Sequence, residues 1–179
     1  MEPMAAMSAA QVHSDVLSLF DEAWPRFTAR LEGLDRDEYL WEPVPGCWTV
    51  RQTPNGVLAD WVEYADPAPV TTIAWRLWHV AVDCLDSYSA RVFDARGTEF
   101  VDQQFTLDVD EALTAVAASG EVFRAGLAER SPESLYDLLG PAWGPYHAST
   151  FLALMLHALD EVIHHAAEIA LLRDLYPSR

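Results

Sequence analysis

Apolar residues recur at steps of three and four along four segments of the chain, and this spacing predicts four amphipathic helices. The predicted helices cover residues 8–34, 70–94, 108–130 and 146–176. Side chains that can accept a hydrogen bond from the first turn precede each one. The expected N-caps are Ser8 or Ser14, Thr71 or Thr72, Asp108, and Ser149 or Thr150. Pro25 lies inside the first pattern and is expected to kink that helix, because proline removes one backbone hydrogen bond.

The fourth predicted helix, Tyr146 to Tyr176, is the longest, and no Gly or Pro interrupts it before Pro177. The third helix has an Asp108–Glu111 pair that resembles a capping box, and Gly120 is expected to weaken it in the middle. Gly97 is the expected end of the second helix. These features favour helices over strands along most of the chain.

Residues 35–69 interrupt the helical pattern and are rich in proline, with Pro-Gly and Asn-Gly pairs and three of the seven tryptophans. A connection of this length is expected to pack against the core, as a Trp-rich lid over one end of it. Thr49 to Arg51 is expected to start a short turn of helix, and no strand is predicted. The sequence therefore predicts an all-α fold, a four-helix bundle with long connections, in a single domain over residues 1–179.

Composition narrows the possible partners. The formal net charge is −17, which argues against nucleic acid and against anionic membrane surfaces. No stretch reaches 18 uninterrupted apolar residues, and MEPMAAMSAAQVHSD lacks the features of a signal peptide. The two cysteines, Cys47 and Cys84, lack metal-ligand or redox spacing, so a reduced pair and a cytoplasmic location are expected.

The fourth helix carries the candidate chemistry. Glu161 and His165 are four residues apart at the edge of its apolar face, so both side chains can reach one point in space. This is how helices hold divalent metals, and a carboxylate among Leu, Ala and Val is costly to bury without a cation. The alternative is a Glu–His pair that only hydrogen-bonds locally. His157, His164 and Glu168 lie just outside this edge and are candidate outer-shell partners or proton carriers.

A metal would need a third ligand from another helix. His79 lies among aromatic residues at the border of the core on the second predicted helix. By periodicity alone, a lone histidine at such a border is more typical of a core residue than of a ligand.

Three motifs, in this order and spacing, resemble the DinB/YfiT-like superfamily. They are Gly46-Cys47-Trp48-Thr49-Val50-Arg51, Trp78-His79-Val80-Ala81, and Glu161-x-x-x-His165-x-x-Glu168-Ile169. The closest similarity is to the mycothiol-dependent maleylpyruvate isomerase type. One departure is the 27 residues between Arg51 and His79, since the first motif usually runs directly into the helix that bears the histidine.

The resemblance implies a four-helix bundle with a metal site formed by His79, Glu161 and His165, in which Glu161 replaces a histidine found in many members. Two imidazoles and a carboxylate suit Zn²⁺ or Ni²⁺ and leave positions open for substrate. His157, one turn before Glu161, is either a reserve ligand or a histidine that only resembles one. The resemblance also implies that a low-molecular-weight thiol can serve as cosubstrate.

The preferred functional hypothesis is a metal-dependent enzyme acting on a small molecule, a thiol-dependent transferase or isomerase, with a hydrolase next. The alternative is a non-catalytic metal- or ligand-binding bundle associated with stress. We expect a pocket at the metal, with Trp75, Phe93 or Leu154 as walls and part of the loop 41–69 as its roof. A homodimer is kept as a possible assembly, and the substrate and the catalytic residues stay open.

Overall fold

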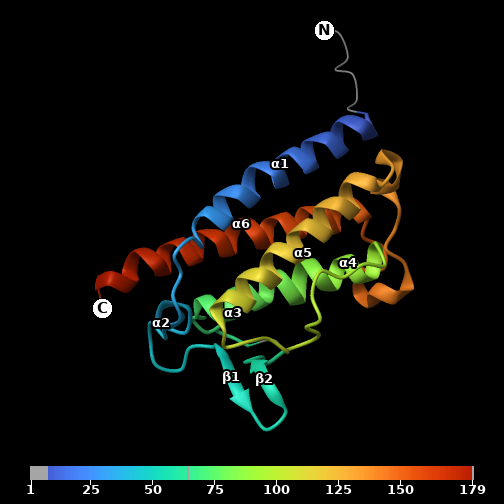
Figure 1. Cartoon of the computed structure of the whole chain (residues 1–179). Helices are drawn as coiled ribbons and strands as arrows, with labels where there is room; N and C mark the ends of the chain where they lie inside the picture. Colours follow the sequence, from blue (N-terminus) through green and yellow to red (C-terminus); the bar gives the residue numbers. More distant parts are fainter. Residues whose placement is uncertain (1–7, 64, 179) are drawn as a thin grey trace.

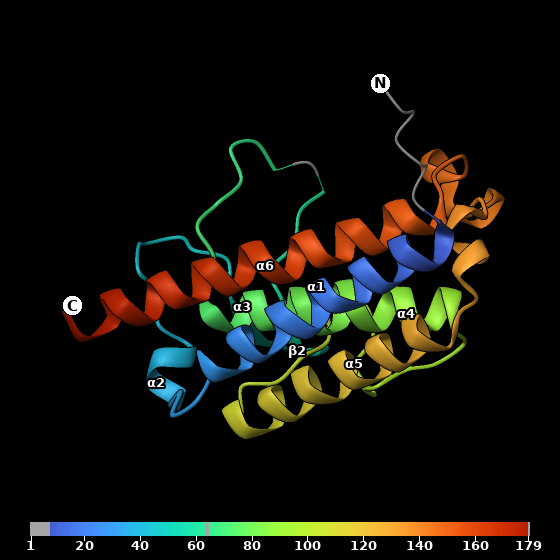
Figure 2. The same cartoon turned by 90° about the horizontal axis from the view of Figure 1, so that it is seen from above.

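The computed structural model describes residues 8–63 and 65–178, and these residues form a mostly helical fold with one small sheet. The long helices are α1 (Ala9–Ala29), α5 (Val109–Glu129) and α6 (Phe151–Leu175). A fourth long segment is continuous through α3 (Ile73–Trp78), a π-helix η1 (His79–Asp86) and α4 (Ser87–Val92). Figure 1 and Figure 2 show these four segments side by side, with the sheet at one end.

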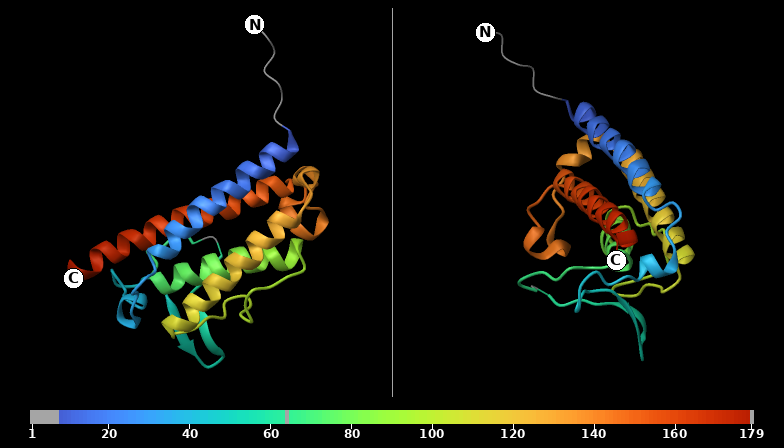
Figure 3. Two further views of the ribbon diagram at one scale, coloured as in Figure 1. Left: turned by 45° about the horizontal axis from the view of Figure 1, so that its top comes forward. Right: turned by 90° about the vertical axis from the view of Figure 1, so that its left-hand side faces the viewer.

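Shorter elements connect the long helices. They are α2 (Arg36–Tyr39), strands β1 (Val50–Thr53) and β2 (Gly56–Ala59), and the 3₁₀ turns η2 (Pro132–Tyr136), η3 (Pro141–Tyr146) and η4 (Tyr176–Ser178). In the end-on view of Figure 3, the hairpin and the segment 139–149 project from different sides of the helices. Within the described residues, no helix is long and apolar enough to cross a bilayer.

Four predicted caps are in place. Ser8, Thr72, Asp108 and Thr150 each accept a hydrogen bond from a backbone N–H in the first turn of the helix that follows. Two predicted boundaries were wrong, because α6 begins at Phe151 and not at Tyr146, and α1 ends at Ala29 and not at residue 34. The 3₁₀ turn η3 ends at Tyr146, and the chain then turns as far as Thr150, which pairs with Leu138 in an isolated β-bridge and caps α6. Residues 1–7, which are the first seven of the fifteen residues judged to lack the features of a signal peptide, lie outside the described residues.

The prediction of no strand was also wrong. β1 and β2 form an antiparallel hairpin in which Val50 lies opposite Ala59 and Thr53 opposite Gly56. Arg51 is therefore in a strand, and the expected helical turn at Thr49 to Arg51 does not exist. Each strand has only four residues, and β1 has a single buried one, so no period-two pattern was long enough to detect. The Asn55-Gly56 pair was the available hairpin signal.

Gly97 does not end the second helical segment, which finishes at Val92. Instead it packs against α5, where a Cβ atom on Gly97 would lie 2.4 Å from the carbonyl oxygen of Ala118. Asp86, which is fully buried, accepts hydrogen bonds from the backbone N–H groups of Gly97 and Thr98 and pairs with Arg96. The buried carboxylate thus anchors the connection to α5, because Arg96 and the two N–H groups of this connection compensate its charge.

Gly120 has a packing role in α5, which its low helix propensity does not indicate. The ring of Trp24 on α1 lies directly over it, so a Cβ atom at Gly120 would be 2.1 Å from Trp24 Cζ2. Trp24 in turn stacks on Phe20, with ring centroids 5.3 Å apart. A residue that weakens the helix locally therefore permits close contact between α1 and α5.

Gly120→Ala is expected to destabilise the protein even though alanine is favoured over glycine in a helix by about 1 kcal/mol. The added methyl group has to displace Trp24, and overpacking of this kind costs about 1–3 kcal/mol. Urea denaturation should give a lower free energy of unfolding. In a Trp24→Ala background the same change should instead stabilise the protein, and a stabilising effect in the wild type would contradict this packing role.

Candidate metal centre

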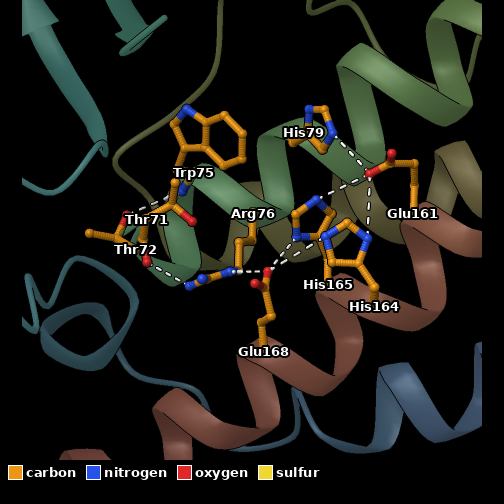
Figure 4. Close-up of polar contacts among 9 residues, drawn as sticks. All are labelled: Thr71, Thr72, Trp75, Arg76, His79, Glu161, His164, His165 and Glu168. Atoms are coloured by element: carbon orange, nitrogen blue, oxygen red, sulfur yellow. Dashed lines mark hydrogen bonds and ion pairs between the residues drawn. The ribbon is translucent and has the colours of Figure 1, made fainter. Parts of the chain in front are cut away.

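The structure brings together three side chains that are far apart in the sequence. His79 is the first residue of η1, while Glu161 and His165 lie one turn apart on α6. His79 Nε2 is 3.1 Å from Glu161 Oε2, and His165 Nε2 is 3.2 Å from the same oxygen (Figure 4). One ligand atom from each of the three residues lies within 4.8 Å of the others. Two imidazoles and a carboxylate from facing helices therefore converge on one point.

The opposite nitrogen of each imidazole faces a second carboxylate. His79 Nδ1 lies 2.9 Å from Asp83 Oδ2, and His165 Nδ1 lies 2.7 Å from Glu168 Oε2. The Glu168 carboxylate holds the proton on Nδ1 of His165 when that ring is neutral, which leaves Nε2 with a free lone pair directed at Glu161. This is the outer arrangement that orients histidine ligands in metal sites. Asp83 lies close to Nδ1 of His79 but makes no hydrogen bond with it.

Arg76 extends this arrangement on the His165 side. Its Nε donates to Glu168 Oε2 over 2.8 Å, and its Nη1 donates to the carbonyl oxygen of Thr71 (Figure 4). The Arg76 side chain is buried although Glu168 is partly exposed, so the guanidinium holds the carboxylate from inside the protein. Sequence reasoning missed Arg76 and Asp83. Asp83 was detectable as an i, i+4 partner of His79, whereas nothing in the sequence connects Arg76 with Glu168.

The π-helical stretch that begins at His79 is a further feature that the sequence did not reveal. Its wider turn spans His79 to Asp86, and it is followed directly by α4. Such wide turns in a helix occur frequently at functional sites, because they change the direction of side chains relative to a regular α-helix. Here the segment carries both His79 and its partner Asp83.

Aromatic side chains from the Trp-rich connection cover His79. The Trp75 ring stacks on the His79 imidazole with centroids 5.0 Å apart and an interplanar angle of 14°. Trp61, from the connection between β2 and α3, stacks on Trp75 at 6.3 Å. Trp75 Nε1 also donates to the carbonyl oxygen of Asp60, which ties this connection to the helix. The expectation that the 41–69 loop packs over this end of the core agrees with these contacts.

Two other histidines lie near Glu161 without joining the central group. His157 Nε2 is 3.7 Å from Glu161 Oε1, and His164 Nδ1 is 3.8 Å from Glu161 Oε2. Both side chains are about half exposed, in contrast to the buried His165. Each belongs to a further candidate ligand group, His157 with Asp160 and Glu161, and His164 with His165 and Glu168.

The charges of the central group are strongly coupled. Burial raises the pKa of Glu161, but hydrogen bonds from His165 and His79 outweigh burial and hold this pKa far below its usual range. Burial lowers the pKa of His79, but its contacts with Asp83 and Glu161 outweigh this effect and raise the pKa to about 9. A hydrogen bond from His165 lowers the pKa of Glu168 to about 2. The free site thus holds its carboxylates ionised and retains a proton on His79.

The donor set fits a divalent cation. Ligand atoms about 2.0–2.1 Å from a tetrahedral zinc ion lie about 3.3 Å from one another. The separations of 3.1 Å and 3.2 Å between the two Nε2 atoms and Glu161 Oε2 are close to that value. A cation bound by these three atoms would therefore require little change in the distances from the two Nε2 atoms to Glu161 Oε2.

A pocket of about 530 Å³ lies near this centre without including it, because none of His79, Glu161 and His165 lines the pocket. Its boundary differs from the prediction, because Leu154 lines it but Trp75 and Phe93 do not. Phe93 packs in the core against Phe123 and Phe151, and Trp75 is covered by the tryptophans of the loop. The segment 139–149, which includes η3, takes the place of the expected roof. His157 lines the pocket and connects it to Glu161.

The fold and the site define a helical protein with a candidate centre for a divalent metal on facing helices. A family model described as the DinB superfamily matches residues 19–169, and the chain belongs to this superfamily. The superfamily is typically metal-binding, and the histidine and glutamate groups described above are the candidate ligands. No curated protein and no solved structure gave a significant match.

Glu168→Gln is expected to weaken the binding of Zn²⁺ or Ni²⁺ by about 10- to 100-fold, since outer carboxylates orient and polarise the histidines that bind a metal. Isothermal titration of the metal-free protein would measure the affinity. Glu121→Gln, the same change at an exposed position on α5, is the matched control and should leave the affinity unchanged. Equal affinities for the wild type and Glu168→Gln would contradict the assigned role of Glu168.

The stabilisation by metal is expected to grow as the pH rises from 6.5 to about 9. In the metal-free protein, the raised pKa of His79 contributes stability that is complete below its ordinary value of 6.5 and is lost as the pH passes about 9. Metal ligation requires the deprotonated imidazole, so binding becomes stronger over the same interval. Calorimetry with metal and with a chelator should give a difference in Tm that increases with pH, and a difference that is independent of pH, or that increases equally in His79→Gln, would contradict this assignment.

Proposed function

We propose that His79, Glu161 and His165 bind one divalent metal, Zn²⁺ or Ni²⁺, and that the protein is a metal-dependent enzyme acting on small organic molecules. The single observation that carries this proposal is the convergence of both Nε2 atoms on Glu161 Oε2, at 3.1 Å and 3.2 Å. His157, which lines a nearby pocket, lies 3.7 Å from the same carboxylate group. Three protein ligands leave positions free for other molecules, which is the pattern of catalytic sites, whereas structural zinc is usually held by four.

The bound metal would supply Lewis acidity, which lowers the pKa of a coordinated water or thiol. The residues of the chain have separate roles around it. Glu168 keeps the imidazole of His165 in the orientation that exposes Nε2, and Asp83 places a negative charge beside the other nitrogen of His79. His157 is half exposed between the pocket and Glu161, so it can carry a proton between solvent and the reacting group. Burial raises the pKa of Tyr88, so its hydroxyl stays protonated and can donate a hydrogen bond to a ligand in the pocket.

The preferred reaction is a transferase or isomerase reaction that uses an external low-molecular-weight thiol. The resemblance to the mycothiol-dependent type suggests it, and the state of the two cysteines is consistent with it. Cys47 and Cys84 are free but buried, and burial raises the pKa of Cys84 well above its usual value. Neither side chain can serve as an accessible thiolate, so a thiol nucleophile has to enter from solution.

Two alternatives stay open. A hydrolase would use the same ligands with water in place of the thiol. A non-catalytic metal-binding module would require a closed site, and His157 is the residue that could close it, because its Nε2 already lies 3.7 Å from Glu161 Oε1. Spectroscopy of the Co²⁺-substituted protein would distinguish four protein ligands from three.

The domain organisation, location, partners and assembly of the protein are also proposals. We regard the four long helical segments as the four-helix bundle of a single domain over residues 1–179. The free cysteines suit a cytoplasmic protein, and the net charge of −17 disfavours nucleic acid and anionic membranes as partners. A homodimer would be consistent with the exposed Leu156, Ile163 and Leu171 on α6.

Metal-loaded protein incubated with mycothiol or glutathione and an electrophilic small molecule is expected to give thiol-dependent turnover. His165→Ala should abolish the turnover and lower metal content, because it removes a buried ligand and the partner of Glu168. A chelator should lower the Tm of the wild type, since a ligand that binds only the native state stabilises it by mass action.

His147→Ala is a matched control, because this histidine is exposed in the connection before α6. It should retain both metal and activity. Metal binding without any turnover, combined with a fully coordinated Co²⁺ spectrum, would refute the enzyme and support the binding module. A Tm that is the same with and without chelator would refute the metal site itself and leave a locally paired Glu161 and His165.

A further inference from the structure

The pocket beside the candidate metal centre has a charge that differs from the rest of the molecule. The chain has 28 Asp and Glu residues and a net charge of −17. Nevertheless, none of the described residues that line the pocket is an Asp or a Glu, and the one permanently charged residue among them is Arg91. An acidic protein therefore has a local site that favours a negative group, because Arg stays charged at all physiological pH values.

Arg91 is held at the pocket by an aromatic ring instead of a carboxylate. Its guanidinium carbon lies 3.5 Å from the centre of a Trp143 ring, and its Nη2 donates to the carbonyl oxygen of Ala142 over 2.9 Å. All eleven basic residues of the chain are arginines, and six of those in the described part form ion pairs with carboxylates. Arg91 forms none within the residues that the structure describes. Its remaining N–H donors are free to bind a carboxylate ligand in bidentate fashion.

His157 links the wall of the pocket to the metal centre, although none of the three candidate ligands lines the pocket. Tyr88, one helical turn before Arg91, contacts His157, with ring centroids 6.1 Å apart. His157 in turn lies 3.7 Å from Glu161. Trp143 also contacts Tyr88 edge-on at 5.9 Å, so aromatic surface is continuous between the arginine and the histidine. A ligand that fills the pocket would thus contact the cation Arg91, aromatic rings, and His157, which lies between the pocket and Glu161.

We propose that this pocket binds a small organic anion with an apolar or aromatic body, whose carboxylate pairs with Arg91 and whose other end points toward His157 and Glu161. This inference rests on the proposed function, because it names the substrate class of the candidate metal centre. The end of the anion that points toward His157 and Glu161 would be its reacting end. The binding of the anion itself does not require metal, because Arg91, Trp143 and Tyr88 supply its contacts. Arg91 and Tyr88 are about 5 Å apart along the helix axis. A carboxylate separated from an aromatic ring by a short aliphatic chain fits this spacing.

A matched pair of probes tests the proposal, namely 4-phenylbutyrate and its neutral amide, 4-phenylbutanamide. Binding is measured by isothermal titration to the full chain in the presence of a chelator, at low salt. The wild type should bind the acid at least tenfold more tightly than the amide. Arg91→Gln should reduce this ratio to less than twofold while leaving the affinity for the amide unchanged, and Arg91→Lys should retain an intermediate ratio, because it keeps the charge but loses the bidentate geometry.

Arg26→Gln is the control variant, because it removes the same charge from an exposed position on α1 and should leave the preference intact. Equal binding of acid and amide by the wild type, or no binding of either at millimolar concentration, would overturn the proposal. An equal loss of affinity for both probes in Arg91→Gln would also overturn it, since the arginine would then only brace Trp143.

The metal centre is tested separately with Glu161→Gln. A preference for the acid that persists in this variant without metal supports the anion pocket, even if metal analysis refutes the proposed function. A preference that appears only in metal-loaded wild type and disappears in Glu161→Gln would mean that the carboxylate binds the metal directly, and this result would refute the role of Arg91. Loss of the pocket preference with intact metal binding and turnover would refute the pocket and leave the proposed function standing.

Discussion

The interaction on which the site depends is the sharing of one carboxylate oxygen by two imidazoles. Glu161 lies on a helix whose neighbouring positions are Ala158, Val162 and other buried apolar residues, where an isolated negative charge would be costly. His79 and His165 compensate this charge from two sides. The same arrangement holds three donor atoms close together, so the compensation that permits burial also prepares a position for a divalent cation.

The surrounding structure serves mainly to fix the orientation of those two rings. On one side, a π-helical turn carries His79 together with Asp83. On the other side, buried Arg76 holds Glu168 against His165. These contacts join the α3–η1–α4 segment to α6, so the geometry of the site is fixed by the packing of two helices. Side chains on rigid helices keep their positions more accurately than side chains on loops.

The two long connections between the helices lie on different sides of the site. The tryptophans of the first connection stack over Trp75 and close the side of the site that faces the hairpin. The second connection, residues 139–149, leaves a pocket on the other side and faces it with Trp143, over which Arg91 lies. Tryptophans therefore cover one side of the site, and the other side has a pocket, lined by Arg91 and aromatic rings, that extends to His157 beside Glu161.

The sequence by itself determined most of the helices and the pair of candidate ligands on a single helix, because these depend on local spacing. The caps at Ser8, Thr72, Asp108 and Thr150 and the i, i+4 pair on α6 were readable from the chain. His79 was selected by family resemblance, since its periodicity alone suggested a core histidine.

Only the tertiary structure revealed the Arg76–Glu168 pair, the hairpin and the pocket with Arg91. These features join residues that are distant in sequence, or lie in strands of four residues, too short for a periodic signal. A pattern along the chain reports which face of an element is apolar. Which side chains meet across two elements is decided by how the elements pack, as the contact of Trp24 with Gly120 shows.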